Sequence, residues 1–203
     1  MKKICLLVSL CVVNILGASS LDQGHTMISE QLDRFNALLN DQDLDAQSKR
    51  KQLLQVVEDA IDFESIALRT LGPYASRLTP EQDKRFRTAY EAILKNWLVD
   101  DLMQFENEEI TLSEYIWLPN EEKVLVRVLG RERSGFAVTN RHRQRSQTEY
   151  VLKEIEGQWR IVDLTINNVN IARNYRSQIS ALARRGKSAD EVIQLFENPS
   201  KVR

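Results

Sequence analysis

Cysteine and histidine are both scarce in this 203-residue chain. The two cysteines, Cys5 and Cys11, lie close to the N-terminus, and the two histidines, His25 and His142, lie far apart in the sequence. If the N-terminal segment is removed, no thiol remains for a disulfide or a zinc site, and no spacing of His, Asp and Glu is typical of a metal site. We therefore expect no metal and no cofactor, and a fold that depends on its apolar core.

The usual motifs of catalytic sites are also missing. The chain has no G-x-S-x-G, no phosphate-binding P-loop and no G-x-G-x-x-G. Asp163 is the one carboxylate in a strongly apolar segment, so one alternative is an enzyme in which Asp163 and Tyr150 act as acid and base. We favour the interpretation that Asp163 faces the open side of a sheet or pairs with an arginine, and that the protein is not an enzyme.

Long apolar runs are absent beyond the first twenty residues. That segment, MKKICLLVSLCVVNILGASS, has two lysines, an apolar stretch and then small residues, and it is too short to span a membrane convincingly. It predicts a cleavable signal peptide, residues 1–20, cut after Ala18 or Ser20; Leu10 argues against lipoprotein processing at Cys11. We expect residues 21–203 to form a single soluble domain and a monomer.

Charge is unevenly distributed along the chain. Residues 21–120 contain 10 Lys and Arg against 19 Asp and Glu, whereas residues 121–203 contain 16 against 10. The run RHRQR supplies Arg141, Arg143 and Arg145 in what reads as a long hairpin connection. Nucleic acid is not expected as a partner, because no aromatic or helical readout elements accompany the run. Anionic lipid headgroups or an acidic protein surface fit better, and a solvated loop is the plain alternative.

Apolar periodicity divides the chain into helices, strands and helices. Helical spacing of apolar residues covers much of residues 26–105, and Thr79, Pro80 and Gln82 form a capping box that opens a long helix. Alternation with a period of two then predicts four strands, around 110–118, 124–129, 150–155 and 159–166. Two further helices, about 170–185 and 188–196, follow. This order predicts an α+β domain with helices on one face of a curved, mainly antiparallel four-stranded sheet.

Two blocks of sequence resemble the MlaC (toluene-tolerance, Ttg2-type) family of periplasmic phospholipid-binding and transport proteins. The first is DFESIALRTLGPYASRLTPEQDKRF, residues 62–86. The second runs from Tyr150 and Leu152 through Gly157, Trp159, Ile161 and Asp163 to the segment NYRSQ, residues 174–178. Departures from the family pattern include Asn168 for the turn glycine, Asn170 for a serine and Ile179 for a phenylalanine.

The resemblance implies a nuclear-transport-factor-two-like cone whose sheet and helices enclose an apolar pocket for phospholipid acyl chains. It also implies a periplasmic location and a role in outer-membrane lipid asymmetry. The partners implied are an outer-membrane lipoprotein–porin complex and an inner-membrane ABC transporter with its substrate-binding hexamer, contacted transiently. A ligand-free periplasmic adaptor with a filled core is the remaining alternative.

The strand at 158–166 carries apolar residues on both faces, so one face is expected to pack on helices and the other to line the lipid pocket. The pocket wall is predicted to consist of Leu94, Leu98, Leu102, Phe105, Val126, Val128, Tyr150, Leu152, Ile161, Val162, Leu164 and Ile166. Each of these is also compatible with ordinary core. Arg141, Arg143 and Arg145 are expected at the pocket mouth or a docking surface. Tyr175 and Arg176 lie at the mouth or, as we favour, lock the last long helix to the sheet.

Overall fold

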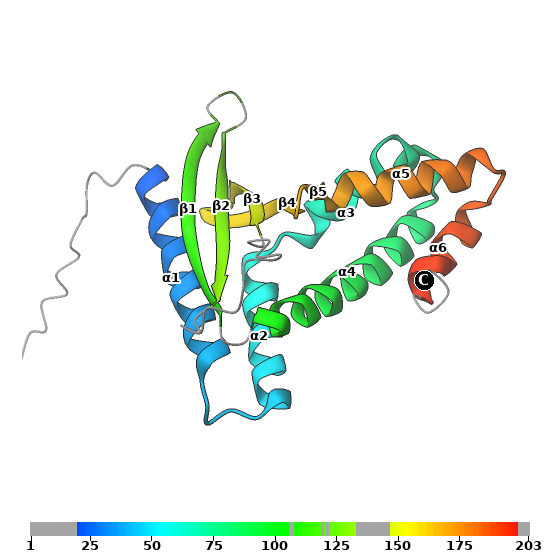
Figure 1. The fold of residues 1–203 in the computed structure, drawn as a ribbon. Helices are drawn as coiled ribbons and strands as arrows, with labels where there is room; N and C mark the ends of the chain where they lie inside the picture. Colours follow the sequence, from blue (N-terminus) through cyan, green and yellow to red (C-terminus); the bar gives the residue numbers. More distant parts are fainter. Residues whose placement is uncertain (1–19, 106–107, 119, 121, 133–146, 199–203) are drawn as a thin grey trace, which may run out of the picture.

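The structure is a computed structural model that describes residues 20–105, 108–118, 120, 122–132 and 147–198 (Figure 1). The N-terminal half is helical, as its apolar periodicity predicts. Its elements are α1 (Ser20–Asn40), α2 (Ala46–Ala60), α3 (Phe63–Leu71), the 3-10 helix η1 (Gly72–Arg77), α4 (Pro80–Leu102) and the 3-10 helix η2 (Met103–Phe105). Asp45, Asp62 and Thr79 cap α2, α3 and α4 with their side chains, and Thr79 and Gln82 form the predicted capping box.

The five strands form one antiparallel sheet in chain order. They are β1 (Glu108–Leu118), β2 (Lys123–Glu132), β3 (Gln147–Ile155), β4 (Gln158–Ile166) and β5 (Val169–Asn170). The predicted α+β class is therefore confirmed, but a four-stranded sheet was an undercount. Asn167 and Asn168 do end β4, with φ of 48° and 65°, and the turn they make returns the chain as the two-residue β5.

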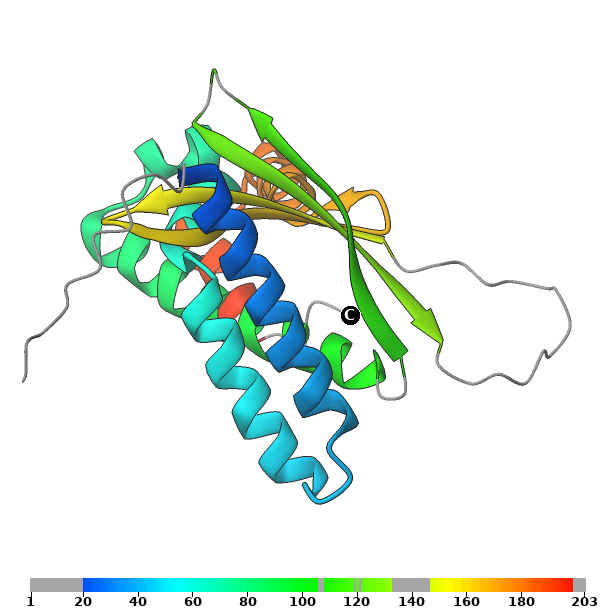
Figure 2. The same cartoon turned by 90° about the vertical axis from the view of Figure 1, so that its left-hand side faces the viewer.

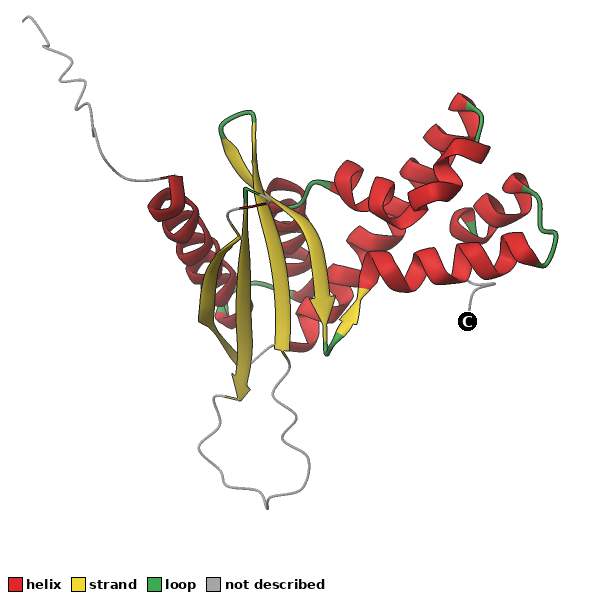
Figure 3. Ribbon diagram, turned by 90° about the horizontal axis from the view of Figure 1, so that it is seen from above, coloured by secondary structure: helices red, strands yellow, loops and turns green. Residues whose placement is uncertain are grey.

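The sheet is strongly twisted, so that β1 and β2 cross the direction of β3 and β4 in Figure 1. The helices α1 and α2 lie side by side as a hairpin, with α1 against β1 and α2 against α4 and β4 (Figure 2). The last two helices, α5 (Ile171–Arg184) and α6 (Ala189–Glu197), extend beyond the β5 edge of the sheet (Figure 3). There α5 packs on α3 and α6 packs on α4.

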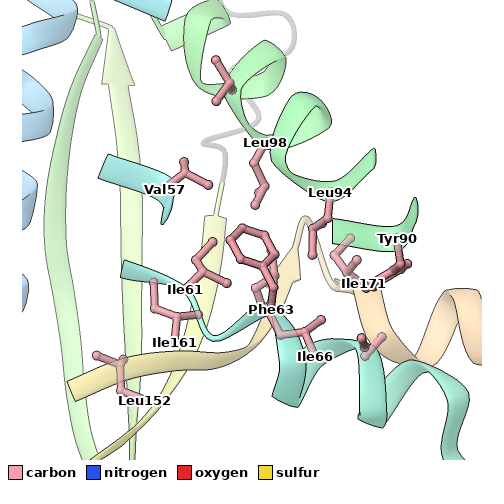
Figure 4. Packing of buried hydrophobic residues seen from close by; sticks show 14 of the residues in the cluster. Val57, Ile61, Phe63, Ile66, Tyr90, Leu94, Leu98, Leu152, Ile161 and Ile171 are labelled. Atoms are coloured by element: carbon pink, nitrogen blue, oxygen red, sulfur yellow. The ribbon is translucent and has the colours of Figure 1, made fainter. Parts of the chain in front are cut away.

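Buried apolar side chains from the helices and the sheet form one continuous cluster. Figure 4 shows Leu94 and Leu98 of α4 facing Phe63 and Ile61 across the interior. The linker between α2 and α3 is fixed to the sheet by a parallel bridge between Ile61 and Ile161, and the Asp62 N–H donates to the Ile161 carbonyl at 2.9 Å. This linker therefore sets the position of the helical hairpin over the sheet.

The helical end of the molecule has an aromatic core of its own. Phe86 and Tyr90 of α4 are fully buried and stack at 5.5 Å, and Phe196 of α6 meets Phe86 edge-on at 5.0 Å. Tyr175 of α5 meets Tyr90 edge-on at 5.6 Å. Such ring pairs stabilise beyond their buried area. This cluster therefore holds α4, α5 and α6 together.

Candidate functional site

An apolar cavity of about 100 Å³ lies between the α1–α2 hairpin, the C-terminal part of α4 and the sheet. Its lining is Met27, Ile28, Gln31, Leu32 and Phe35 of α1, Val56, Val57 and Ala60 of α2 with the following Ile61, Leu98 and Leu102 of α4, and Ile110, Val128, Tyr150 and Ile161 of the sheet. Only Gln31 and Tyr150 bring polar side-chain atoms to this wall. The cavity is therefore suited to hydrocarbon.

A smaller cavity of about 20 Å³ adjoins the first, because both are lined by Leu98, Leu102, Ile110, Val128 and Tyr150. The smaller cavity adds four residues, Asp101, Gly130, Thr148 and Ile166. Polar groups are thus concentrated at one end of a continuous apolar site.

The periodicity of each helix and strand determines which of its side chains lie at the site. On α1, Ile28, Leu32 and Phe35 are spaced so that they share one helical face, and on α4 Leu98 and Leu102 stand one turn apart. On β2 and β3, Val128 and Tyr150 lie on the face of the sheet that the helices cover. The site is therefore the place where three helical faces and one sheet face meet without filling the space between them.

The cavity has little free volume in this conformation. Its 100 Å³ is less than the roughly 150 Å³ of an apolar cavity that binds benzene. A longer ligand requires the walls to separate. The wall formed by α1 is held to the sheet edge by Asn36, whose amide donates to the Ile110 carbonyl at 2.8 Å and accepts from the Ile110 N–H at 3.0 Å.

The polar end of the site contains one carboxyl group, that of Asp101. Among the described residues, none donates a hydrogen bond to the Asp101 carboxylate or forms an ion pair with it, and burial raises the pKa of Asp101 above its ordinary value. Burial also raises the pKa of Tyr150 to about 12, and the nearby Asp101 charge adds to this shift. The side chain of Thr148 lies beside Tyr150 and partly offsets this shift in the Tyr150 pKa. Asp101 is thus a partly buried acid to which no described residue supplies a donor or a cation.

The predicted wall residues divide into three groups. Leu98, Leu102, Val128, Tyr150, Ile161 and Ile166 line the two cavities. Leu94, Val126, Leu152, Val162 and Leu164 are buried, but they are not part of the lining. The side chain of Phe105 and the residues Arg141, Arg143 and Arg145 lie outside the described part of the structure.

Tyr175 and Arg176 lie away from the cavity. Tyr175 borders a separate, open groove of about 780 Å³ on the outer side of α4, together with Ile93, Trp97 and several charged residues. The Arg176 guanidinium donates to the carbonyl of Arg69 at the end of α3, from Nε at 2.7 Å and also from Nη2. Arg176 therefore ties α5 to α3, where we expected it to tie α5 to the sheet or to lie at the mouth.

Asp163 and Tyr150 do not form an acid–base pair in this structure. Asp163 is opposite Val151 in the β3–β4 register, and Tyr150 and Val151 point to opposite faces of the sheet. The Asp163 carboxylate accepts from Arg69 at 3.1 Å, from Asn170 at 3.1 Å and from the Leu164 N–H at 3.0 Å. Asp163 thus joins α3, β4 and α5, which is the arginine pairing that we favoured.

Sequence reasoning placed no residue of α1 or α2 in the site, although these helices supply more than half of the larger cavity's lining. The signal was present, since Ile28, Leu32 and Phe35 repeat at helical spacing. However, a helical repeat alone does not say whether its apolar face meets other side chains or borders a cavity. Asp101 was also missed, because only its position beside Tyr150 in space distinguishes it from Asp100.

Fold and site together define a class of protein: an α+β molecule whose helices and antiparallel sheet enclose an apolar cavity. Among the described residues, no helix is long and apolar enough to cross a membrane. The family model described as MlaC protein matches residues 27–198, and the chain belongs to the MlaC family.

Two known proteins illustrate the relationship. The toluene tolerance protein ttg2D of Pseudomonas putida is 26% identical over 143 residues, which cover 70% of this chain and 62% of that protein's length. A solved structure of similar fold is the phospholipid-binding protein from Ralstonia solanacearum in complex with a phospholipid. It has a TM-score of 0.63 and 16% identity, and the match covers 89% of this chain and 96% of that chain.

Proposed function

We propose that this protein is a periplasmic carrier that binds the acyl chains of a phospholipid in the cavity between the α1–α2 hairpin, α4 and the sheet. The observation that carries the proposal is the almost wholly apolar lining of that cavity. Membership of the MlaC family and the similarity of fold to a protein that binds phospholipid support it.

The energetics of the cargo explain why such a cavity is needed. Two sixteen-carbon chains contain about 28 methylenes, and their burial contributes about 22 kcal/mol at roughly 0.8 kcal/mol each. Water cannot hold both chains at that cost, so a carrier must offer an interior nearly as apolar as the bilayer. Transfer is then almost isoenergetic, and modest docking energies can set its direction.

Loading requires the cavity to enlarge. We infer that the α1–α2 hairpin separates from the sheet and α4, because these surfaces meet at the cavity and Asn36 supplies two hydrogen bonds between α1 and β1. The movement exposes apolar faces to hydrocarbon. It therefore suits uptake at a membrane or inside a docked complex.

The finer parts of the proposal concern the mouth and the partners. The β2–β3 connection carries Arg141, Arg143 and Arg145, and its flanking residues Gly130 and Thr148 line the smaller cavity. We propose that these arginines contact a lipid headgroup or an acidic docking partner. The carrier would shuttle lipid between the outer-membrane lipoprotein–porin complex and the inner-membrane ABC transporter with its substrate-binding hexamer, after residues 1–20 direct its export.

A cavity-filling variant tests the carrier function. Ala60 lines the cavity and Ala92 lines the open groove outside α4, so Ala60→Phe and Ala92→Phe add the same ring at different places. We expect Ala60→Phe to take up at least about fivefold less fluorescent phospholipid from vesicles, because each displaced methylene forfeits roughly 0.8 kcal/mol. Ala92→Phe should load like the wild type. Equal loading by all three proteins would contradict the proposed site.

A further inference from the structure

The polar end of the cavity suggests which lipid the site prefers, an inference that rests on the proposed carrier function. Asp101, Tyr150 and Thr148 line the smaller cavity together, and each has an oxygen-bearing side chain. The remaining members of that lining are Leu98, Leu102, Ile110, Val128, Gly130 and Ile166. A ligand whose chains occupy the apolar part would bring its polar end to these oxygens.

Asp101 differs from Asp163 and Asp100 in the hydrogen bonds and ion pairs that its carboxylate makes. Asp163 is buried and accepts three hydrogen bonds, and Asp100 forms an ion pair with Arg50. Asp101 is partly buried, and no described residue supplies it with a hydrogen bond or a cation. Partial burial of a carboxylate weakens its solvation, and a ligand that donates hydrogen bonds to it can offset that loss.

We propose that Asp101 selects phospholipids whose headgroup carries a primary ammonium, which would sit between the Asp101 carboxylate and the hydroxyl groups of Tyr150 and Thr148. A primary ammonium has three N–H donors, one for each of these three side chains, and its charge neutralises the carboxylate. A quaternary ammonium offers the charge without the donors. A headgroup with only a phosphate charge and hydroxyls leaves Asp101 uncompensated and adds a like charge nearby.

The test is competitive loading of the full mature chain. Delipidated protein is incubated with vesicles of equimolar phosphatidylethanolamine and phosphatidylglycerol with the same acyl chains, and the bound lipids are extracted and quantified. We expect the wild type to be enriched about fivefold in phosphatidylethanolamine, which corresponds to a net charge-assisted hydrogen bond that is partly exposed to water. Replacing phosphatidylethanolamine with phosphatidylcholine should reduce the enrichment.

Variants assign the preference to one carboxylate. Asp101→Asn should bind the two lipids in the vesicle ratio, and Asp101→Glu should retain part of the preference for phosphatidylethanolamine. The matched control is Asp100→Asn, the adjacent residue on the outer side of α4, which should keep the wild-type ratio. Thermal unfolding of each variant confirms that it is folded.

The experiment distinguishes a failure of the selection by Asp101 from a failure of the carrier function. Lipid bound in the vesicle ratio by the wild type, or an enrichment that survives in Asp101→Asn, would overturn the selection by Asp101 and leave the carrier function intact. Failure of the wild type to take up any lipid would contradict the carrier function and the inference with it.

Discussion

At the scale of single residues, two aspartates of this fold have different roles because different groups surround them. Asp163 is 8% exposed and accepts three hydrogen bonds, and it connects three elements of the fold. Asp101 borders the cavity, and no residue in the described part of the chain supplies it with such a donor. The sequence suggested Asp163 as a candidate acid or base of an enzyme, because it is the one carboxylate in an apolar strand. Its three donors show why it is there: it neutralises and positions Arg69 and fixes the start of α5.

Asp163→Ala should therefore destabilise the fold without affecting the cavity. It removes the acceptor of the Arg69 guanidinium and of the Leu164 N–H, and it leaves the Asn170 amide with the Thr165 hydroxyl at 3.3 Å as its acceptor. We expect a loss of about 2 kcal/mol in the free energy of unfolding, since Arg69 is partly exposed. Urea unfolding measures it. Asp100→Ala removes an exposed ion pair and should cost at most about 0.5 kcal/mol. Equal effects of the two substitutions would show that the Asp163 network contributes nothing special.

Ionisation of Tyr150 should lower the free energy of unfolding at alkaline pH, and Tyr150→Phe should remove this effect. Burial raises its pKa from 10.0 to about 12, so the folded state favours the neutral phenol. That contribution is complete below pH 10 and is lost as the pH rises from 10 to 12. Between pH 9 and 11 the wild type should lose about 1 kcal/mol relative to Tyr150→Phe, as measured by urea unfolding at each pH. Parallel stability profiles for the two proteins would contradict a buried phenol at this position.

At the scale of elements, the cavity depends on how α1 is held against β1. The Asn36 side chain pairs with both backbone groups of Ile110, much as a neighbouring strand would, and so it occupies part of the open edge of the sheet. Lys49 of α2, which is 3% exposed, donates to the Leu39 carbonyl at 3.0 Å and holds the end of α1. Asn36 therefore joins α1 to the edge of the sheet, and Lys49 joins α2 to the end of α1.

Asn36→Ala should loosen this contact. We expect the free energy of unfolding to fall by about 1–2 kcal/mol, because two backbone groups of Ile110 lose their partner. We also expect phospholipid transfer between labelled and unlabelled vesicles to become faster, since the cavity opens more often. Asn40→Ala, which removes only a hydrogen bond within α1, is the control for helix stability. A destabilised Asn36→Ala protein with an unchanged transfer rate would show that α1 does not gate the cavity.

At the scale of the whole molecule, local sequence signals predicted the elements well and their spatial relations less well. The capping box at Thr79, the helical spacing of apolar residues and the strand alternation predicted most helix and strand positions, because these signals are local. The two-residue β5 was not predicted, since so short a strand has no period. The close contact between Gly72 (φ +51°) and Arg176 was not predicted either. A Cβ at position 72 would lie 2.8 Å from the Arg176 side chain, and the two residues are more than a hundred positions apart in the sequence.

The site shows the same limit. Leu98, Leu102, Val128, Tyr150, Ile161 and Ile166 were named from alternation and helical spacing, and they do meet around the cavities. Leu94, Val126, Leu152 and Leu164 have the same pattern in sequence yet are packed in the core. Whether an inward-facing residue meets a neighbour or a void depends on the angle between elements, which the pattern does not encode.

The central claim is that this molecule carries a phospholipid between its α1–α2 hairpin and its sheet. Native mass spectrometry of the mature protein, purified from cells without detergent, tests it most directly. The account predicts a bound mass of about one phospholipid that is released on denaturation and identified after solvent extraction. A bare polypeptide mass that stays unchanged after incubation with liposomes would contradict it.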